Sequence, residues 1–198
     1  MKQITENEMR ALLVLFKDVT TDYNANNISK KLGLTAMGAL KILKKLEKQK
    51  LIKSKQMGKA VFYKANLGNS YTKNYFQFLL RKEAEETEPK IKRWVKELRK
   101  LQNNTQAGIL FGSILGKGNP NDVDILLILK QSQNKQANQT LTDINKLTHK
   151  KIHAVKQTKN DLIENIKNKD KVIINALKNS VALYGYEDIM EVMQHATL

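Results

Sequence analysis

The stretch that decides the fold is "GILFGSILGKGNPNDVDILLIL", residues 108–129. An apolar run ends at Gly112 and Ser113. A loop rich in Gly, Asn and Pro follows, and a second apolar run begins with Asp122 and Asp124. Short apolar runs bounded by turn residues predict buried β-strands. Because side chains alternate along a strand, we expect both aspartates on one face of the sheet.

Two carboxylates on one face repel each other unless a cation lies between them. Asp122 and Asp124 are hard oxygen ligands of the kind that Mg²⁺ prefers, and bound Mg²⁺ keeps waters that phosphate oxygens can replace. The turn at Gly112 and Ser113 leaves backbone N–H groups and a hydroxyl free to hold phosphate. The pattern therefore predicts a site for Mg²⁺ and phosphate that suits phosphoryl or nucleotidyl transfer.

This arrangement resembles the nucleotidyltransferase family related to DNA polymerase beta. That family has a Gly-Ser, a spacer of about ten residues and an Asp-x-Asp flanked by apolar residues, and "FGSILGKGNPNDVDILLIL" contains each part in order. The resemblance continues through "KKIHAVKQTKNDLIENI" to "NALKNSVALYGYEDIMEVM", so it covers residues 104–198 and is greatest to small prokaryotic members. It implies that Gly112 and Ser113 bind nucleotide phosphates and that Asp122 and Asp124 bind Mg²⁺ and are catalytic. The implied reaction is nucleotidyl transfer from a nucleoside triphosphate to an acceptor hydroxyl.

The chain departs from the family in one place. Active members carry a third carboxylate on the next strand, but the strand predicted here, "KIHAVKQT", contains His153 and no acid. His153 is a candidate catalytic base because imidazole titrates in the physiological range, although a lone strand histidine is more often packed or solvent-facing. Asp161 lies at a predicted helix start, where the helix dipole accounts for an acid. Lys117 in the spacer is either a further phosphate ligand or an ordinary loop residue.

The N-terminal third contains "NISKKLGLTAMGALKILKKLEKQKLI". It predicts a short helix over 28–32 with Asn27 as its N-cap, a tight turn at Gly33 and a longer basic helix capped by Thr35. "LIKSK" and "AVFYKA" then predict two strands joined by a Met-Gly-Lys turn. Helical spacing predicts an inner face of the longer helix formed by Met37, Leu40, Leu43 and Leu46.

A short helix, a glycine turn, a basic helix and a basic hairpin together resemble winged-helix DNA-binding domains over residues 1–67. The resemblance implies that the basic helix enters the major groove and that the hairpin contacts phosphate or the minor groove. The implied DNA-contacting residues are Thr35, Ala36, Met37, Lys41, Lys44, Lys45, Lys53, Lys55 and Lys59. A winged helix that docks onto another protein is the alternative.

Residues 68–103 consist almost entirely of helix formers and predict a helical linker with a break near residue 88 and a restart at Pro89. One apolar stripe comprises Tyr71, Tyr75, Phe78 and Leu79. It predicts either intramolecular core or a dimer interface, and we expect a homodimer because flanking helices of winged-helix proteins often pair. Trp94, in the second stripe, is expected in the core.

The charge balance favours an anionic partner. The chain has 35 Lys and Arg against 19 Asp and Glu, a net charge of +16 over 198 residues. Such an excess is typical of nucleic-acid-binding proteins, although lysine-rich solvated faces would give the same count. There is no cysteine, which excludes disulfides and thiolate metal sites. Without a long apolar run or a signal-peptide pattern, we expect a cytoplasmic protein with no membrane contact.

These observations predict an α+β protein with an N-terminal winged helix (1–67), a helical linker (68–103) and a nucleotidyltransferase-fold mixed sheet with flanking helices (104–198). The leading interpretation is a DNA-binding transcriptional regulator whose second domain binds Mg²⁺-nucleotide or a partner protein. The alternative is an active nucleotidyltransferase that modifies a protein, an RNA or a small molecule. Small members of this type are often antitoxins paired with a toxin, which adds a third, protein-binding role.

Overall fold

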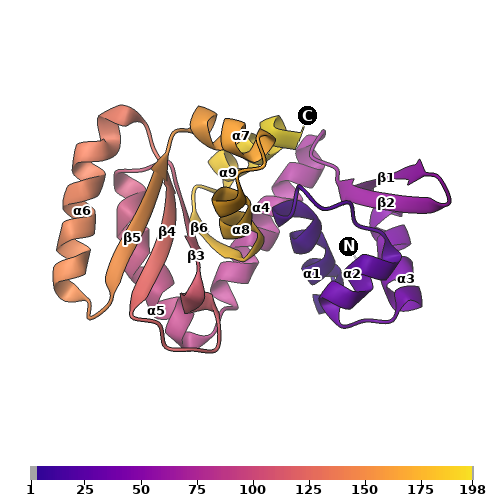
Figure 1. Ribbon diagram of the computed structural model, residues 1–198, viewed down its shortest axis with the longest axis horizontal. Coiled ribbons are helices and arrows are strands. Elements are labelled where there is room, and N and C mark those ends of the chain that lie inside the picture. Colours follow the sequence, from indigo (N-terminus) through magenta and orange to yellow (C-terminus); the bar gives the residue numbers. More distant parts are fainter. Residues whose placement is uncertain (1–3, 198) are drawn as a thin grey trace. The chain divides into compact units, whose positions relative to one another are not determined.

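The computed structural model describes residues 4–197 and has the mixed α+β class predicted from the sequence (Figure 1). The chain forms two compact units, Met1–Leu79 and Leu80–Leu198, which are described separately below. None of the helices among residues 4–197 combines the length and the apolar character needed to cross a membrane.

The first unit consists of three helices, a hairpin and the start of a fourth helix. The elements are α1 (Glu6–Lys17), α2 (Ala25–Leu32), α3 (Ala36–Lys48), β1 (Ile52–Met57), β2 (Ala60–Ala65) and α4 (Ser70–Glu85). β1 and β2 are antiparallel, as predicted. The core contains Leu12, Ile28, Leu43 and Leu46, all fully buried, and the rings of Phe16 and Phe76 stack with centroids 5.0 Å apart.

The ends of α2 and α3 show how local side chains set the helix limits. Thr35 caps α3 as predicted, because its hydroxyl accepts a hydrogen bond from the Gly38 N–H at 3.0 Å. The prediction for α2 was wrong by three residues. Its N-cap is Asn24, and Asn27 instead closes a capping box by accepting from the Asn24 N–H at 2.7 Å.

Met37 was predicted on the inner face of α3, and this prediction was wrong. The buried residues of α3 are Ala39, Leu43 and Leu46. At 100° per residue, Met37 lies about 160° around the helix from Ala39, and it is 62% exposed. The buried stripe begins at Ala39, so Met37 belongs to the outer face.

Residues 68–103, predicted as a linker, are divided between the two units. Phe76 and Leu79 on α4 are buried in the first. α5 (Pro89–Leu98) starts after the predicted break, with Pro at its first turn, and belongs to the second unit. Trp94 lies in the core of that unit, as predicted. The α5 stripe is buried in the core, whereas the predicted α4 stripe is divided: Leu79 is buried and Tyr71 and Phe78 are exposed.

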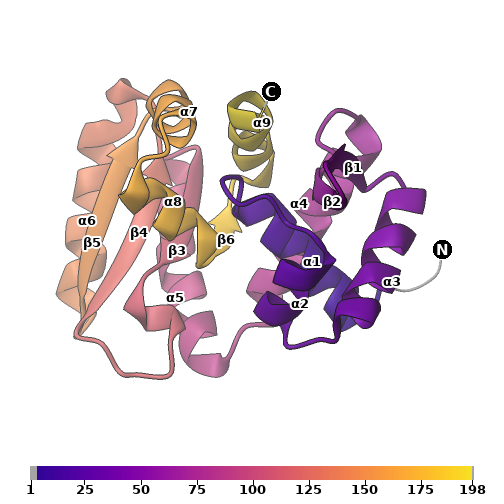
Figure 2. The same ribbon diagram turned by 45° about the vertical axis from the view of Figure 1, so that its right-hand side comes forward.

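The second unit is built on a four-stranded sheet in the order β5-β4-β3-β6 (Figure 2). β3 is antiparallel to β4 and to β6, and β4 is parallel to β5. The strands are β3 (Ala107–Phe111), β4 (Asp122–Ile128), β5 (Lys151–Gln157) and β6 (Ser180–Tyr184). The helices after α5 are α6 (Asn134–Leu147), α7 (Lys159–Lys167), α8 (Lys171–Lys178) and α9 (Tyr186–Thr197).

The two faces of this sheet are covered by different helices. Alternate residues of β3 and β4, including Leu110 and Ile125, form one core with α5 and α6. The opposite face contacts α7, α8 and α9. Because side chains alternate, Asp122 and Asp124 belong to the face covered by α7, α8 and α9, at the end of β4 that follows the Gly-rich loop.

Candidate functional site

The sheet register brings the predicted site residues of three strands together. Asp124 on β4 is paired with Phe111 on β3 and with His153 on β5. Asp122 lies two residues before Asp124 on the same face. Gly112 follows Phe111 directly, so the Gly-Ser turn, both carboxylates and the imidazole meet at one edge of the sheet.

Gly112 lies against the Asp124 carboxylate. Its φ is +83°, a value that L side chains rarely adopt, and a Cβ at this position would lie 2.2 Å from Asp124 Oδ2. The backbone of the turn therefore packs directly against the acid. The sequence pattern predicted a phosphate-binding turn, and the geometry adds that the same glycine leaves room for a carboxylate.

We expect Gly112→Ala to displace the Asp124 side chain and to lower the free energy of unfolding by about 1–3 kcal/mol, the scale of backbone strain at such positions. Urea denaturation measures this change. Gly118→Ala is the matched control, since a Cβ there meets nothing within 4 Å. Equal stability of the two variants would contradict the close packing of Gly112 on Asp124.

His153 faces both carboxylates. Its Nδ1 lies 3.6 Å from Asp122 Oδ2 and 3.8 Å from Asp124 Oδ1. These distances are too long for direct hydrogen bonds, but a protonated imidazole there is a counter-charge to both acids. β5, the strand next to β4, carries this histidine and no acidic residue.

The electrostatics of the acid pair are unfavourable without a cation. Partial burial, followed by repulsion from Asp122, raises the pKa of Asp124 above its usual value, and His153 opposes that rise. A carboxyl group whose pKa is raised by a like charge is typical of functional sites. A divalent cation between the two carboxylates would remove the repulsion.

The number of metal-ligating side chains limits the kind of cation site that these residues can form. Among residues 4–197, no group of three or more His, Cys, Asp or Glu side chains is placed to hold a metal. Asp122 and Asp124 supply two carboxylates only. Mg²⁺ is usually bound by one or two carboxylates together with waters and substrate phosphates. The pair has the number and type of protein donors that Mg²⁺ uses where waters and phosphates complete its coordination.

The other predicted phosphate ligands are less constrained. Ser113 is exposed and opens a short 3₁₀ turn, Ser113–Leu115, which directly follows Gly112. Lys117 is exposed in the loop before β4 and makes no ion pair with any described residue. Ser113 therefore directly follows the glycine that lies against Asp124, whereas no contact places Lys117 near the carboxylates.

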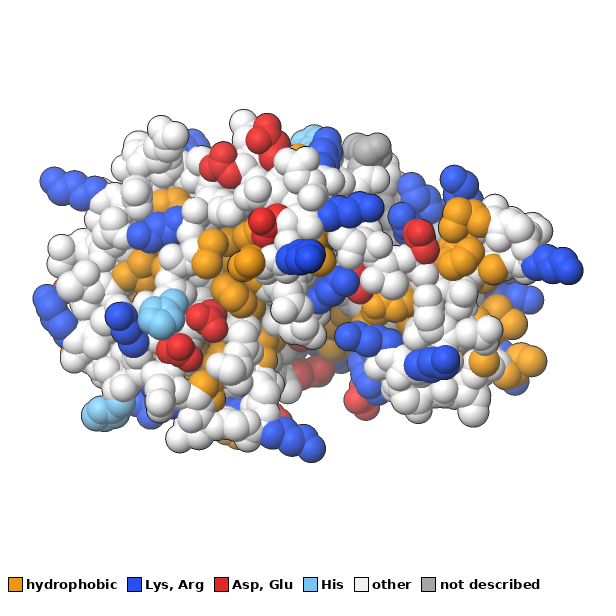
Figure 3. Space-filling view, in the orientation of Figure 1, with side chains coloured by type: hydrophobic (Ala, Val, Ile, Leu, Met, Phe, Trp, Pro, Cys, Tyr) orange, Lys and Arg blue, Asp and Glu red, His pale blue; other side chains and the backbone are white. Residues whose placement is uncertain are grey.

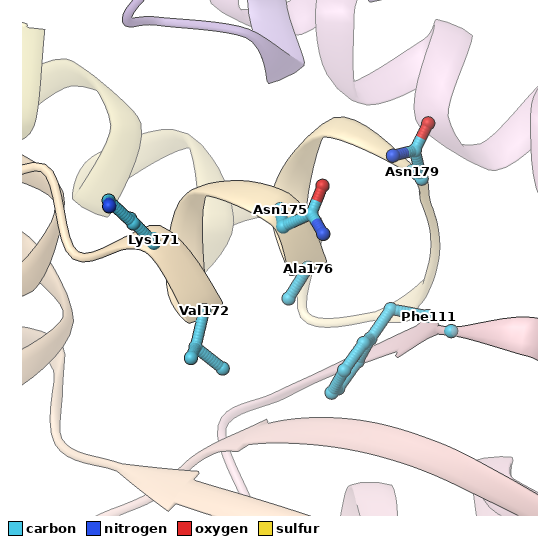
Figure 4. Close-up of a pocket in the computed structure, with 7 residues that line it drawn as sticks. Phe111, Lys171, Val172, Asn175, Ala176 and Asn179 are labelled. Carbon is cyan, nitrogen blue, oxygen red and sulfur yellow. The ribbon is translucent and has the colours of Figure 1, made fainter.

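A groove of about 570 Å³ opens beside this site and was missed in the sequence (Figure 4). Its walls come from the end of β3 and from α8. The lining residues are Phe111, Gly112, Lys171, Val172, Asn175, Ala176 and Asn179. In the apolar segment "KVIINALKN", residues 171–179, the side chains that could have indicated this groove are Lys171, Val172 and Asn175, which are exposed.

A second surface of interest lies on α3 in the first unit. With Ala39 facing the core, Lys41, Lys44 and Lys48 lie about 140–200° around the helix, beside Met37. All four are exposed. Lys48 was not among the predicted DNA-contacting residues, although its helical phase would have placed it with them. Thr35 and Ala36, at the start of the helix, are also exposed.

Lys45 was included among the DNA-contacting residues, but the structure gives its ammonium another partner. It forms a hydrogen-bonded ion pair with Glu8, a buried residue of α1. Burial is the largest single influence and raises the pKa of Glu8, but the hydrogen bond and charge of Lys45 together with the hydrogen bonds from Thr5 lower this pKa below its usual value. Lys45 thus ties α3 to α1, and we exclude it from the proposed DNA surface.

The hairpin presents further cations. Lys53 and Lys55 on β1 and Lys59 in the turn are exposed. Figure 3 shows Lys and Arg side chains along this hairpin, with exposed hydrophobic side chains beside them. Within residues 4–197, these three lysines and Lys41, Lys44 and Lys48 make no ion pair.

Comparisons with known proteins do not supply a family for this chain: no family model, no curated protein and no solved structure matches it. Two surfaces of the described residues stand out chemically: the acid pair with its groove, and the lysine surface of the first unit. The first carries two neighbouring carboxylates and the second carries exposed lysines without ion pairs among the described residues.

Proposed function

We propose that the protein is a DNA-binding transcriptional regulator whose second unit binds a nucleotide with Mg²⁺. The observation that carries this proposal is the outer face of α3. Lys41, Lys44 and Lys48 are exposed there without acidic partners among the described residues. The three helices and the β1–β2 hairpin resemble a winged helix, in which α3 is the recognition helix and the hairpin is the wing.

An exposed helix of this kind suits the major groove, which admits an α-helix. Thr35, Ala36 and Met37 stand at its N-terminal end, where recognition helices contact base edges. The lysines further along α3 and on the hairpin are suited to phosphates, and such contacts supply most of the sequence-independent affinity.

Salt dependence tests this assignment. We expect each of the six lysines without ion pairs on α3 and the hairpin to neutralise one phosphate. The logarithm of the association constant then falls with the logarithm of the salt concentration with a slope of about −5. Affinity for a fluorescently labelled duplex then falls by about a thousandfold between roughly 50 and 200 mM salt, as measured by anisotropy. A slope near zero would contradict DNA binding and would favour a winged helix that docks onto protein.

The second unit supplies the regulatory site in this proposal. Asp122, Asp124 and the Gly112-Ser113 turn form a site suited to Mg²⁺ and the phosphates of a nucleotide. The missing third carboxylate favours binding without turnover. A nucleotide-dependent change of DNA affinity would follow if the two units are coupled.

A specific observation favours a second candidate, an active nucleotidyltransferase. His153 Nδ1 lies within 4 Å of both carboxylates, so a proton acceptor is present at the reacting edge. Bound Mg²⁺ would supply charge neutralisation at the phosphate oxygens. Asp122 and Asp124 would hold the cation, and His153 would accept the proton of the acceptor hydroxyl. The hydroxyl oxygen would bond to the α-phosphorus as the bond from that phosphorus to the pyrophosphate leaving group breaks.

We expect His153→Asp to raise the Mg²⁺ affinity about tenfold, because carboxylate sites bind divalent cations more tightly as charged ligands are added. Isothermal titration with MgCl₂ measures the change. His149→Asp is the control, since His149 is exposed and has no contact with the acid pair. If both variants bind Mg²⁺ like the wild type, His153 does not stand at a third-ligand position.

A further inference from the structure

We propose that the groove between β3 and α8 binds the base and sugar of the nucleotide, and that Asn175 contacts the base. This inference rests on the proposed Mg²⁺-nucleotide site and names the part of the ligand that the carboxylates do not hold. It assigns a role to the side chains of α8, which the acid pair leaves unexplained.

The groove is continuous with the acid pair. Gly112 lines the groove and also packs against Asp124. Phe111, the next lining residue, is the cross-strand partner of Asp124 on the same face. A nucleotide whose phosphates lie at Gly112 and Asp124 therefore has its nucleoside beside this groove. The volume of about 570 Å³ is in the range of small-molecule sites.

The walls suit a flat aromatic ring. Figure 4 shows Phe111 on β3 and Val172 on α8 pointing into the same space beneath the helix, with Ala176 above it. Val172 is 65% exposed, an unusual position for a large apolar side chain on a helix with a buried face. A base lying between Phe111 and Val172 would cover both and would gain stacking on the phenyl ring.

Asn175 supplies the polar group. Its side chain is exposed, lines the groove and makes no hydrogen bond to any described residue. A side-chain amide offers donors and an acceptor together, which matches the edge of a nucleobase, as in Asn contacts to adenine. Lys171, also exposed at the groove, adds a cation for a phosphate or a ribose hydroxyl.

The experiment compares nucleotides with their phosphate part alone. The full chain is titrated calorimetrically with ATP, GTP, CTP, UTP and inorganic tripolyphosphate, each with Mg²⁺. We expect at least one nucleoside triphosphate to bind about tenfold or more tightly than tripolyphosphate, the gain from one well-made polar contact with apolar burial. Asn175→Ala and Val172→Ser should each remove most of that gain and leave tripolyphosphate binding unchanged. Both side chains are exposed, so the variants fold.

Asn160→Ala is the matched control, because Asn160 is exposed on α7 and does not line the groove. Equal affinity of tripolyphosphate and every nucleotide would overturn the nucleoside subsite but keep the phosphate site. Nucleotide affinities in Asn175→Ala and Val172→Ser within about twofold of the wild type would also overturn it. Absence of binding by any of the five ligands would overturn the proposed nucleotide site itself.

Discussion

Reversing the charge at Lys41 and Lys59 is expected to reduce the affinity for duplex DNA by at least about a hundredfold. Lys41 lies on the outer face of α3 and Lys59 in the hairpin turn, and both are exposed without an ion pair among the described residues. Lys41→Glu with Lys59→Glu replaces two attractions to phosphate by two repulsions, and each like-charge contact costs more than 1.4 kcal/mol, or tenfold. Anisotropy of a labelled duplex measures the loss.

The control must carry the same change in net charge. Lys135→Glu with Lys167→Glu reverses two exposed lysines on α6 and α7, in the other unit. This pair should weaken binding only slightly, through the overall field of the protein. If both double variants lose affinity equally, DNA binding follows from net charge and not from the α3 and hairpin surface. If neither loses affinity, the first unit does not bind DNA.

The parts of the fold that depend on local sequence were predictable. Thr35 as a cap, the hairpin after α3 and the strands on either side of the Gly-rich loop follow from turn residues and hydrophobic period. The error at Asn27 arose because Asn24 is an equally good N-cap three residues earlier. The helix that forms is the longer one, which begins after Asn24. The error at Met37 arose because the sequence of a short amphipathic helix does not define exactly which side chains face the core. Tertiary packing determines this.

The remaining features depend on contacts between distant residues. Lys45 and Glu8 are 37 positions apart, so no local pattern shows that Lys45 is committed to α1. The approach of His153 to the acid pair requires the parallel pairing of β4 and β5, with α6 as the crossover. The groove at α8 depends on how that helix covers the end of β3. Such features come from topology and packing, and sequence alone could name only the residues.

Replacing both acids, in Asp122→Ala with Asp124→Ala, is expected to reduce Mg²⁺-dependent nucleotide affinity by more than about a hundredfold, because both protein ligands of the cation are removed. Calorimetric titration of ATP, GTP, CTP and UTP with Mg²⁺ measures the loss. If a nucleotide binds the wild type and the double variant with equal affinity, the assignment of these carboxylates is contradicted. A variant with both acids intact but Asp143→Ala, an exposed acid on α6, is the control and should bind like the wild type.

A stability measurement separates loss of a ligand site from loss of the fold. The pKa of Asp124 is raised in the folded chain by burial and by Asp122, so its ionisation costs folding stability as pH rises through that pKa. Asp124→Asn removes this cost, and at neutral pH it should raise the free energy of unfolding of the ligand-free protein while weakening nucleotide binding. At a pH below the usual pKa of an aspartate the advantage should disappear. A variant that gains stability and loses the ligand would show that the acid pair is retained for binding, at the expense of the apo fold. A variant that loses both would mean that Asp124 is a structural residue.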